Sequence, residues 1–222
     1  MLIVRFFKKI MVILLLFMLA ACADKAAKFK PLRVVCLGDS ITYGYKLENP
    51  AKQSYPAQLN KLSRGQWHVL NSGVNGATLL KQGDIPIVKQ AAYQRAMKFR
   101  PDVVVVILGT NDMKKTNWKY RQHFVSDYGE LIENFRTLES KPHIIACTIP
   151  PIFGAHANGF GEEKTIEINR KVRQVVAHEN IDLLDIYTPL LKREKLFQDG
   201  VHPDARGAQE IAILVLDKVS SL

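Results

Sequence analysis

The chain has 222 residues, of which 47% are hydrophobic and 23% charged, and its formal net charge is +10. These values are typical of a folded globular domain and exclude disordered, collagen-like and low-complexity chains. Three cysteines are too few for a disulfide scaffold and lack zinc-ligand spacing, so we expect no metal site. Basic residues never form a block of five, so the sequence predicts no nucleic-acid partner.

The first 21 residues have the pattern of a targeting segment. A short basic start is followed by the 12-residue apolar run Ile10–Ala21, whereas a membrane-spanning helix needs about 20 residues. The run is typical of a secretory signal peptide, and Leu19–Cys22 (LAAC) resembles the lipobox of bacterial lipoproteins. This resemblance implies cleavage before Cys22, lipidation of that cysteine, and a tether at 22–31 that holds the domain at 32–222 on a membrane of the bacterial cell envelope. An ordinary secreted protein with an incidental cysteine is the alternative.

The remaining chain alternates short apolar runs with helical patterns. Strands are predicted at 32–37, 67–70, 103–108, 143–147 and 181–184, and helices at 55–62, 85–99, 117–138, 162–178 and 205–219. Strands separated by helices indicate right-handed crossovers and a parallel sheet that is covered on both faces. We therefore expect an α/β fold, a three-layer α/β/α sandwich with a five-stranded, mostly parallel sheet of the flavodoxin-like type.

Residues with useful chemistry follow directly on the predicted strands. The segment GDSIT follows the first strand at 38–42, NSGVNGA follows the second at 71–77, and GTND follows the third at 109–112. A fourth segment, DGVHP at 199–203, precedes the last helix. Ligands of such sheets bind outside the carboxyl ends of the strands. We therefore expect these four segments to meet at one edge of the sheet.

Ser40, His202 and Asp199 match the requirements of acyl transfer. A serine hydroxyl is a weak nucleophile until a base takes its proton, and an imidazole is suited to that role near neutral pH. A carboxylate fixes the imidazole tautomer and stabilises its charged form. The oxyanion that develops needs preorganised N–H donors. For these we expect the backbone N–H groups of Ser40 and Gly73 and the side-chain amide of Asn111.

The four segments, in this order, resemble the SGNH hydrolase superfamily, also called GDSL esterases and lipases, and the likeness covers 32–222. The superfamily takes its name from the serine, glycine, asparagine and histidine found here as Ser40, Gly73, Asn111 and His202. The resemblance implies a catalytic Ser-His-Asp triad, an acyl-enzyme on the serine and no cofactor or metal.

Resemblance to bacterial carbohydrate acetylesterases favours short-chain substrates, namely O-acetyl esters of carbohydrates. The chain has no obvious lid or long apolar insertion for a fatty tail. A lysophospholipase or thioesterase acting on longer acyl chains is the alternative among enzymes. A glycan-binding lipoprotein without catalytic activity is the alternative from another class.

Several other conspicuous residues are expected to serve the fold. Asp39 is predicted to hold the turn before the serine by hydrogen bonds, and Gly76 to serve only turn geometry. Cys36 and Cys147 lie in apolar strands and are predicted to be buried thiols.

Two loops near the expected site have more than one interpretation. The segments 77–86 and 150–161 are predicted to be either mobile surface connections or walls of a substrate site. The aromatic residues Trp118 and Tyr120, just past GTND, are predicted to pack on the core rather than to serve as sugar platforms.

Overall fold

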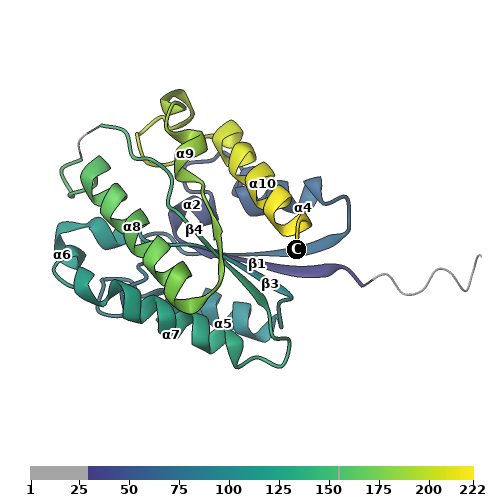
Figure 1. The fold of residues 1–222 in the computed structure, drawn as a ribbon. Helices are drawn as coiled ribbons and strands as arrows, with labels where there is room; N and C mark the ends of the chain where they lie inside the picture. The colour runs from purple at the N-terminus through teal and green to yellow at the C-terminus, as the bar shows by residue number, and fades with distance from the viewer. Residues whose placement is uncertain (1–29, 155) are drawn as a thin grey trace, which may run out of the picture. The chain divides into compact units, whose positions relative to one another are not determined.

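The computed structural model describes residues 30–154 and 156–222. The chain divides after Pro31, and the unit described below is Leu32–Leu222, whose ribbon is shown in Figure 1. The predictions of a signal peptide and of a lipidated Cys22 lie outside the described residues. Within those residues, no helix has the length and apolar character that crossing a bilayer requires.

A five-stranded sheet forms the centre of this unit. Its strands lie in the order β2-β1-β3-β4-β5, and every neighbouring pair is parallel. The strands are β1 Leu32–Gly38, β2 Trp67–Gly73, β3 Val103–Ile107, β4 His143–Cys147 and β5 Asp182–Leu184. All five predicted strands are confirmed, and the sheet is wholly rather than mostly parallel. In the register, Gly38 lies opposite both Gly73 and Ile107, so three strands end at the same edge.

Helices cover both faces of the sheet and complete the expected three layers (Figure 1). The longer helices are α4 Tyr55–Leu62, α5 Ala91–Lys98, α7 Phe124–Arg136, α8 Glu162–Glu179 and α10 Ala205–Ser220. Short helices are α2 Ser40–Tyr43, α3 Pro50–Gln53, α6 Lys115–Trp118 and α9 Tyr187–Leu190. One face packs against α5, α7 and α8, and the other against α4 and α10.

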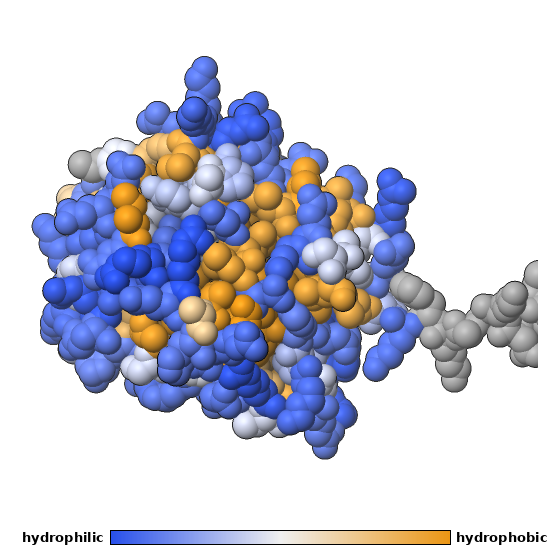
Figure 2. Space-filling view, in the orientation of Figure 1, coloured by the Kyte–Doolittle hydropathy of each residue, from blue (hydrophilic) through white to orange (hydrophobic). Residues whose placement is uncertain are grey.

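Alternation along β1 places apolar side chains in both interlayer cores. Val35 and Leu37 belong to one buried cluster, while Val34 and Cys36 belong to the other. Each fully buried side chain of this kind contributes about 1.5–3 kcal/mol. In the surface view, apolar side chains gather between the two helical layers and hydrophilic ones cover most of the remaining visible face (Figure 2). The well-packed sheet provides a firm support for the loops at its carboxyl edge.

The helix predicted at 85–99 is shorter in the structure. It begins at Ala91, and a single 3-10 turn precedes it at Ile87–Lys89. The preceding segment pairs with Thr78 instead: the Thr78 N–H donates to the Ile85 carbonyl and the Ile87 N–H donates to the Thr78 carbonyl, both at 2.9 Å. These bonds hold the segment extended, and Pro86, which has no N–H, fits an extended segment better than a helix interior.

The helix predicted at 117–138 is also divided. The first part is α6, which ends at Trp118, and α7 begins only at Phe124. Between them the Tyr120 N–H donates to the Asn117 carbonyl and the His123 N–H donates to the Tyr120 carbonyl, both at 2.9 Å. In both bonds the acceptor lies three residues before the donor, as in 3-10 turns, and these turns separate α6 from α7. The apolar pattern at 117–138 therefore covers two helices.

Candidate active site

The turn after β1 places Ser40 at the carboxyl edge of the sheet. Ser40 is the first residue of α2, and the preceding Asp39 caps that helix by accepting the Ile41 N–H at 2.9 Å. The predicted structural role of Asp39 is therefore confirmed. Burial raises the pKa of Asp39 to about 6, although the hydrogen bond from Ile41 opposes the shift. Since the first N–H groups of a helix have no acceptor within the helix, the Ser40 N–H is left for a ligand.

A chain of hydrogen bonds joins Ser40, His202 and Asp199. The Ser40 Oγ lies 2.9 Å from His202 Nε2, and His202 Nδ1 lies 2.8 Å from Asp199 Oδ2. The serine and the histidine are 162 residues apart in the sequence. The structure thus brings together the three residues that the sequence analysis selected for acyl transfer, with each ring nitrogen facing the expected partner.

A tight turn holds Asp199 and His202 in this orientation. Asp199 Oδ1 accepts the backbone N–H groups of Val201 at 3.0 Å and His202 at 2.7 Å. Gly200 has φ +76°, and a Cβ there would lie 2.2 Å from the Phe153 carbonyl oxygen. The Phe153 N–H in turn donates to the Gly200 carbonyl at 2.8 Å. Part of the 150–161 loop is therefore bound to the turn that carries the histidine, and is neither a free surface connection nor only a substrate wall.

The environment of Asp199 favours its ionised form. Burial by itself raises the pKa of this carboxyl group, but the hydrogen bonds from the His202 N–H, from Lys46 and from the His202 ring outweigh it and hold the pKa below its ordinary value. The Lys46 ammonium lies 2.8 Å from Asp199 Oδ2. The sequence analysis did not select Lys46, which nonetheless contacts the same oxygen as the imidazole.

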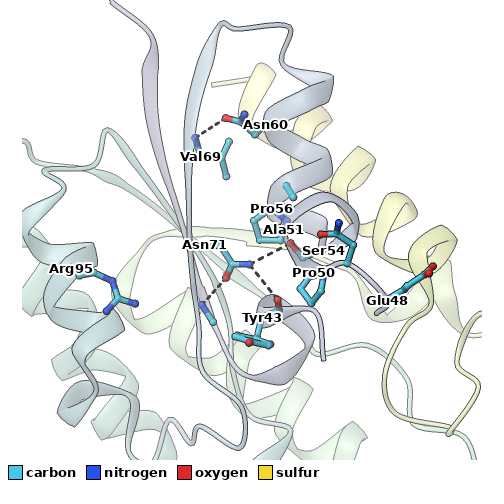
Figure 3. A pocket seen from close by; sticks show the side chains of 13 residues that line it. Tyr43, Glu48, Pro50, Ala51, Ser54, Pro56, Asn60, Val69, Asn71 and Arg95 are labelled. Carbon is cyan, nitrogen blue, oxygen red and sulfur yellow. Dashed lines mark hydrogen bonds between the residues drawn. The ribbon is translucent and has the colours of Figure 1, made fainter. Parts of the chain in front are cut away.

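The structure corrects the expected role of Gly73. Its N–H already donates to Asn71 Oδ1 at 2.9 Å, so it is not available to an oxyanion (Figure 3). The side-chain amide of Asn71 donates in turn to the Thr42 carbonyl at 2.9 Å. A Cβ on Gly73 would lie 2.2 Å from the backbone nitrogen of Tyr43. Gly73 therefore serves the close packing of β2 against α2.

Gly76 has the properties that were expected of Gly73. It adopts φ +78°, and within 30–154 and 156–222 its N–H donates to no other group. Its neighbour Ala77 accepts the side-chain amide of Asn111 at 3.1 Å, and Val74 donates to the Gly38 carbonyl at 3.0 Å. These bonds hold the Gly76 turn between the Asn111 side chain and the end of β1. The interpretation of Gly76 as a turn residue alone is therefore incomplete.

Asn111 and Asp112 occupy different positions after β3. The Asn111 side chain is almost buried, and it uses one amide hydrogen on the Ala77 carbonyl, which leaves the second for a ligand. Asp112 accepts the N–H groups of Leu79 at 3.0 Å and Leu80 at 2.7 Å. Burial raises the pKa of Asp112 to about 7 while those two N–H groups oppose the shift. Asp112 therefore anchors the beginning of the 77–86 loop, whose first four residues are buried while Gln82 and Asp84 are exposed.

The remaining candidate residues serve the core. Cys36 and Cys147 are free, buried thiols as predicted, and burial raises the pKa of Cys36 to about 12. Trp118 packs against the core as predicted, and Lys164 and Arg121 lie over its ring, 5.0 and 5.4 Å from the centroid. In the part of the chain that the structure describes, no group of three or more potential ligands could hold a metal ion.

One open cavity adjoins the hydrogen-bonded chain, and a larger one, lined by none of its three residues, lies nearby. The smaller has a volume of 190 Å³ and is lined in part by Lys46, Asp199 and His202. The larger, of 680 Å³, runs beside the edge strand β2, and Tyr43 and Arg95 lie on opposite sides of it (Figure 3). Tyr43 is three residues from Ser40, so the larger groove begins one helical turn from the serine.

An Asn111→Ala variant tests the role of the amide. We expect kcat for ester hydrolysis to fall about 10²–10³-fold, because the substitution removes the amide that the sequence analysis expects to donate to the oxyanion. KM should change little, since the donor acts on charge that develops after binding. Steady-state kinetics on p-nitrophenyl acetate measure both constants. An equal loss in an Asn134→Ala variant, on the exposed side of α7, would point instead to a general effect on the fold.

The parallel sheet between two helical layers is the fold of the SGNH class of hydrolases. The sequence profile of the GDSL-like Lipase/Acylhydrolase family matches residues 36–210. The chain belongs to that family.

A curated relative and two solved structures show the same relationship. An acetylxylan esterase from Xylanibacter ruminicola is 33% identical over 208 residues, which cover 86% of this chain and 43% of that protein. The chain thus spans less than half the length of that relative. A carbohydrate acetylesterase family member from Sinorhizobium meliloti is 21% identical, with a TM-score of 0.68, over 86% of this chain and 98% of that one. The native aryl esterase of M. smegmatis is 19% identical, with a TM-score of 0.69, over 86% and 99%. The two structures share the fold.

Proposed function

We propose that the protein is a serine esterase that forms an acyl-enzyme on Ser40. The hydrogen-bonded chain from Ser40 through His202 to Asp199 carries this proposal. His202 Nε2 takes the hydroxyl proton while Ser40 Oγ attacks the ester carbonyl carbon. The imidazolium, stabilised by the Asp199 carboxylate, then returns the proton to the leaving alcohol. A water molecule, deprotonated by the same nitrogen, attacks the acyl carbon, and the imidazolium then returns the proton to Ser40 Oγ as the carboxylic acid is released.

Three donors are proposed to stabilise the oxyanion in both steps. They are the backbone N–H groups of Ser40 and Gly76 and the second amide hydrogen of Asn111. Each lies on a different loop at the carboxyl edge, and each has an N–H that the fold does not use. A site preorganised in this way stabilises charge without further rearrangement. Such electrostatic stabilisation is usually the largest single contribution to the rate enhancement of an enzyme.

The substrate class that we propose is an O-acetyl ester of a carbohydrate. Similarity to the acetylxylan esterase supports this class, because it extends over most of this chain. The 680 Å³ groove offers polar and aromatic side chains, among them Tyr43, Asn49 and Arg95, which suit a hydroxyl-rich chain.

Acyl-chain preference tests the substrate class. We expect kcat/KM to be highest for p-nitrophenyl acetate and to decline steadily toward the octanoate and longer esters, as the similarity to the acetylxylan esterase suggests. Acetate release from acetylated xylan, with the Ser40→Ala variant as control, tests the alcohol part. A preference for long acyl chains would support the lysophospholipase or thioesterase alternative. Glycan binding without ester turnover would support the alternative of a glycan-binding lipoprotein without catalytic activity.

We further propose that Cys22 carries a lipid anchor that holds this domain at a bacterial envelope membrane. The support is the LAAC sequence at the end of the apolar run Ile10–Ala21. Incorporation of labelled palmitate into the full-length chain, and its absence from a Cys22→Ser variant, test this proposal. Labelling that survives the substitution would contradict it.

A further inference from the structure

The turn after the nucleophile helix contacts the other two members of the triad. Tyr45 and Lys46 belong to the segment 44–47, which we call the 44–47 turn. The Tyr45 N–H donates to the Ser40 carbonyl at 2.9 Å, and the Leu47 N–H donates to the Gly44 carbonyl at 3.2 Å. The turn is thus bound at its start to the residue that carries the nucleophile.

The side chains of this turn reach the histidine and the aspartate separately. The Tyr45 ring lies edge-on to the His202 ring, with centroids 4.9 Å apart and an interplanar angle of 64°. The Lys46 ammonium lies 2.8 Å from Asp199 Oδ2. Both contacts come from neighbouring residues of one short turn, so a single backbone conformation sets them together.

The backbone of Lys46 is held in an unfavourable region. Its φ is +66°, in the left-handed region that non-glycine residues rarely occupy. Such strain persists only where the surrounding structure holds it, and it is concentrated at functional sites. With Lys46 in this conformation, its ammonium contacts the carboxylate while the side chain stays 54% exposed.

Lys46 and His202 use the same carboxylate oxygen. His202 Nδ1 and Lys46 Nζ each lie 2.8 Å from Asp199 Oδ2, so the ammonium lies within a few ångströms of the imidazole. A fixed positive charge there disfavours a second positive charge on the ring. The ammonium also partly neutralises the Asp199 carboxylate, whose negative charge would otherwise act on the imidazolium alone.

We propose that Lys46 is a positioning residue that acts through Asp199: it places a fixed positive charge beside the His202 ring, which opposes protonation of the ring and extends activity to lower pH. The proposal rests on the esterase function proposed above for its kinetic consequence, and on geometry alone for the titration. The other titratable or charged groups near the pair are Tyr45, Glu48, Asp204 with its partner Arg206, and His156, which lies beside Gly200. These remain unchanged when Lys46 alone is substituted.

NMR titration of the His202 ring tests the proposal without any substrate. The ring signal is assigned by its loss in a His202→Gln variant. In Lys46→Met, which keeps the length of the side chain and a β-carbon but removes the charge, we expect the midpoint to rise by about half a pH unit. Lys46→Arg should titrate like the unsubstituted protein. Lys52→Met, an exposed residue of α3, is the matched control and should not move the midpoint.

Kinetics on p-nitrophenyl acetate supply the second readout. In Lys46→Met, the acid limb of the pH profile of kcat/KM should move to higher pH by the same amount as the titration midpoint. The variant should then be about threefold slower at pH values below the limb and near normal on the plateau. About 1 M NaCl should reduce the difference between the two proteins, since it screens a partly exposed charge. An unchanged midpoint in Lys46→Met overturns the proposal, as does an equal loss of rate at every pH. Absence of esterase turnover would overturn the proposed function, while the titration would still decide the role of Lys46.

Discussion

A Ser40→Ala variant is expected to lose about 10³–10⁶-fold in kcat while the fold remains intact. The hydroxyl is the only atom of the site placed to attack a carbonyl carbon while giving its proton to the imidazole, at 2.9 Å from His202 Nε2. Without it, only binding and the oxyanion donors remain to accelerate attack by water. Turnover of p-nitrophenyl acetate at saturating substrate measures the loss.

The structure explains why this substitution should not unfold the protein. A serine at a helix start often serves as the cap, but here Asp39 caps α2. Among the residues that the structure describes, the Ser40 hydroxyl bonds only to the imidazole. We expect the melting temperature to change by less than about 3 °C, which corresponds to roughly 1 kcal/mol in a domain of this size. Ser126→Ala on α7, where the hydroxyl bonds to the His123 carbonyl, is a control that should keep full activity.

The architecture could be predicted because the sheet is buried on both faces. β3 is an unbroken β-branched run, and such a run between two helical patterns has few other solutions than a central parallel strand. The convergence of Ser40 and His202 followed from the same rule, since it depends only on which edge of the sheet each loop joins. Neither conclusion required a knowledge of loop conformation.

The oxyanion donors and the lysine depend on loop conformation, and the sequence does not determine that. Gly73 and Gly76 are both glycines in one loop, and only the side chain of Asn71, which takes the Gly73 N–H, distinguishes them. Lys46 reaches Asp199 through a left-handed backbone conformation that no local pattern predicts for a lysine. Asn71 binds an N–H only two residues away, whereas Asp199 is remote in the sequence from Lys46, and no residue pattern indicates either contact.

An Asp199→Asn variant should lower kcat about 10⁴-fold near neutral pH. An asparagine of nearly the same shape presents an amide N–H to His202 Nδ1 when its oxygen keeps the backbone bonds of Val201 and His202. The ring then carries its proton on Nε2, where it cannot accept the proton of the Ser40 hydroxyl. The effect is therefore on the chemical step, and KM should remain within a few-fold. Asp217→Asn, an exposed residue of α10, is the matched control.

The same substitution has a second consequence that depends on pH. Hydrogen bonds lower the pKa of Asp199 in the folded protein below its unfolded value of about 3.9. A carboxyl group of this kind stabilises the fold at pH values above the unfolded pKa, and the stabilisation is lost as the pH falls through the folded pKa. The difference in melting temperature between the unsubstituted protein and Asp199→Asn should thus be constant near neutral pH and shrink below about pH 4. A difference that grows on acidification would show that the carboxylate is not held in its charged form, and the account of how Asp199 supports the imidazolium would fail with it.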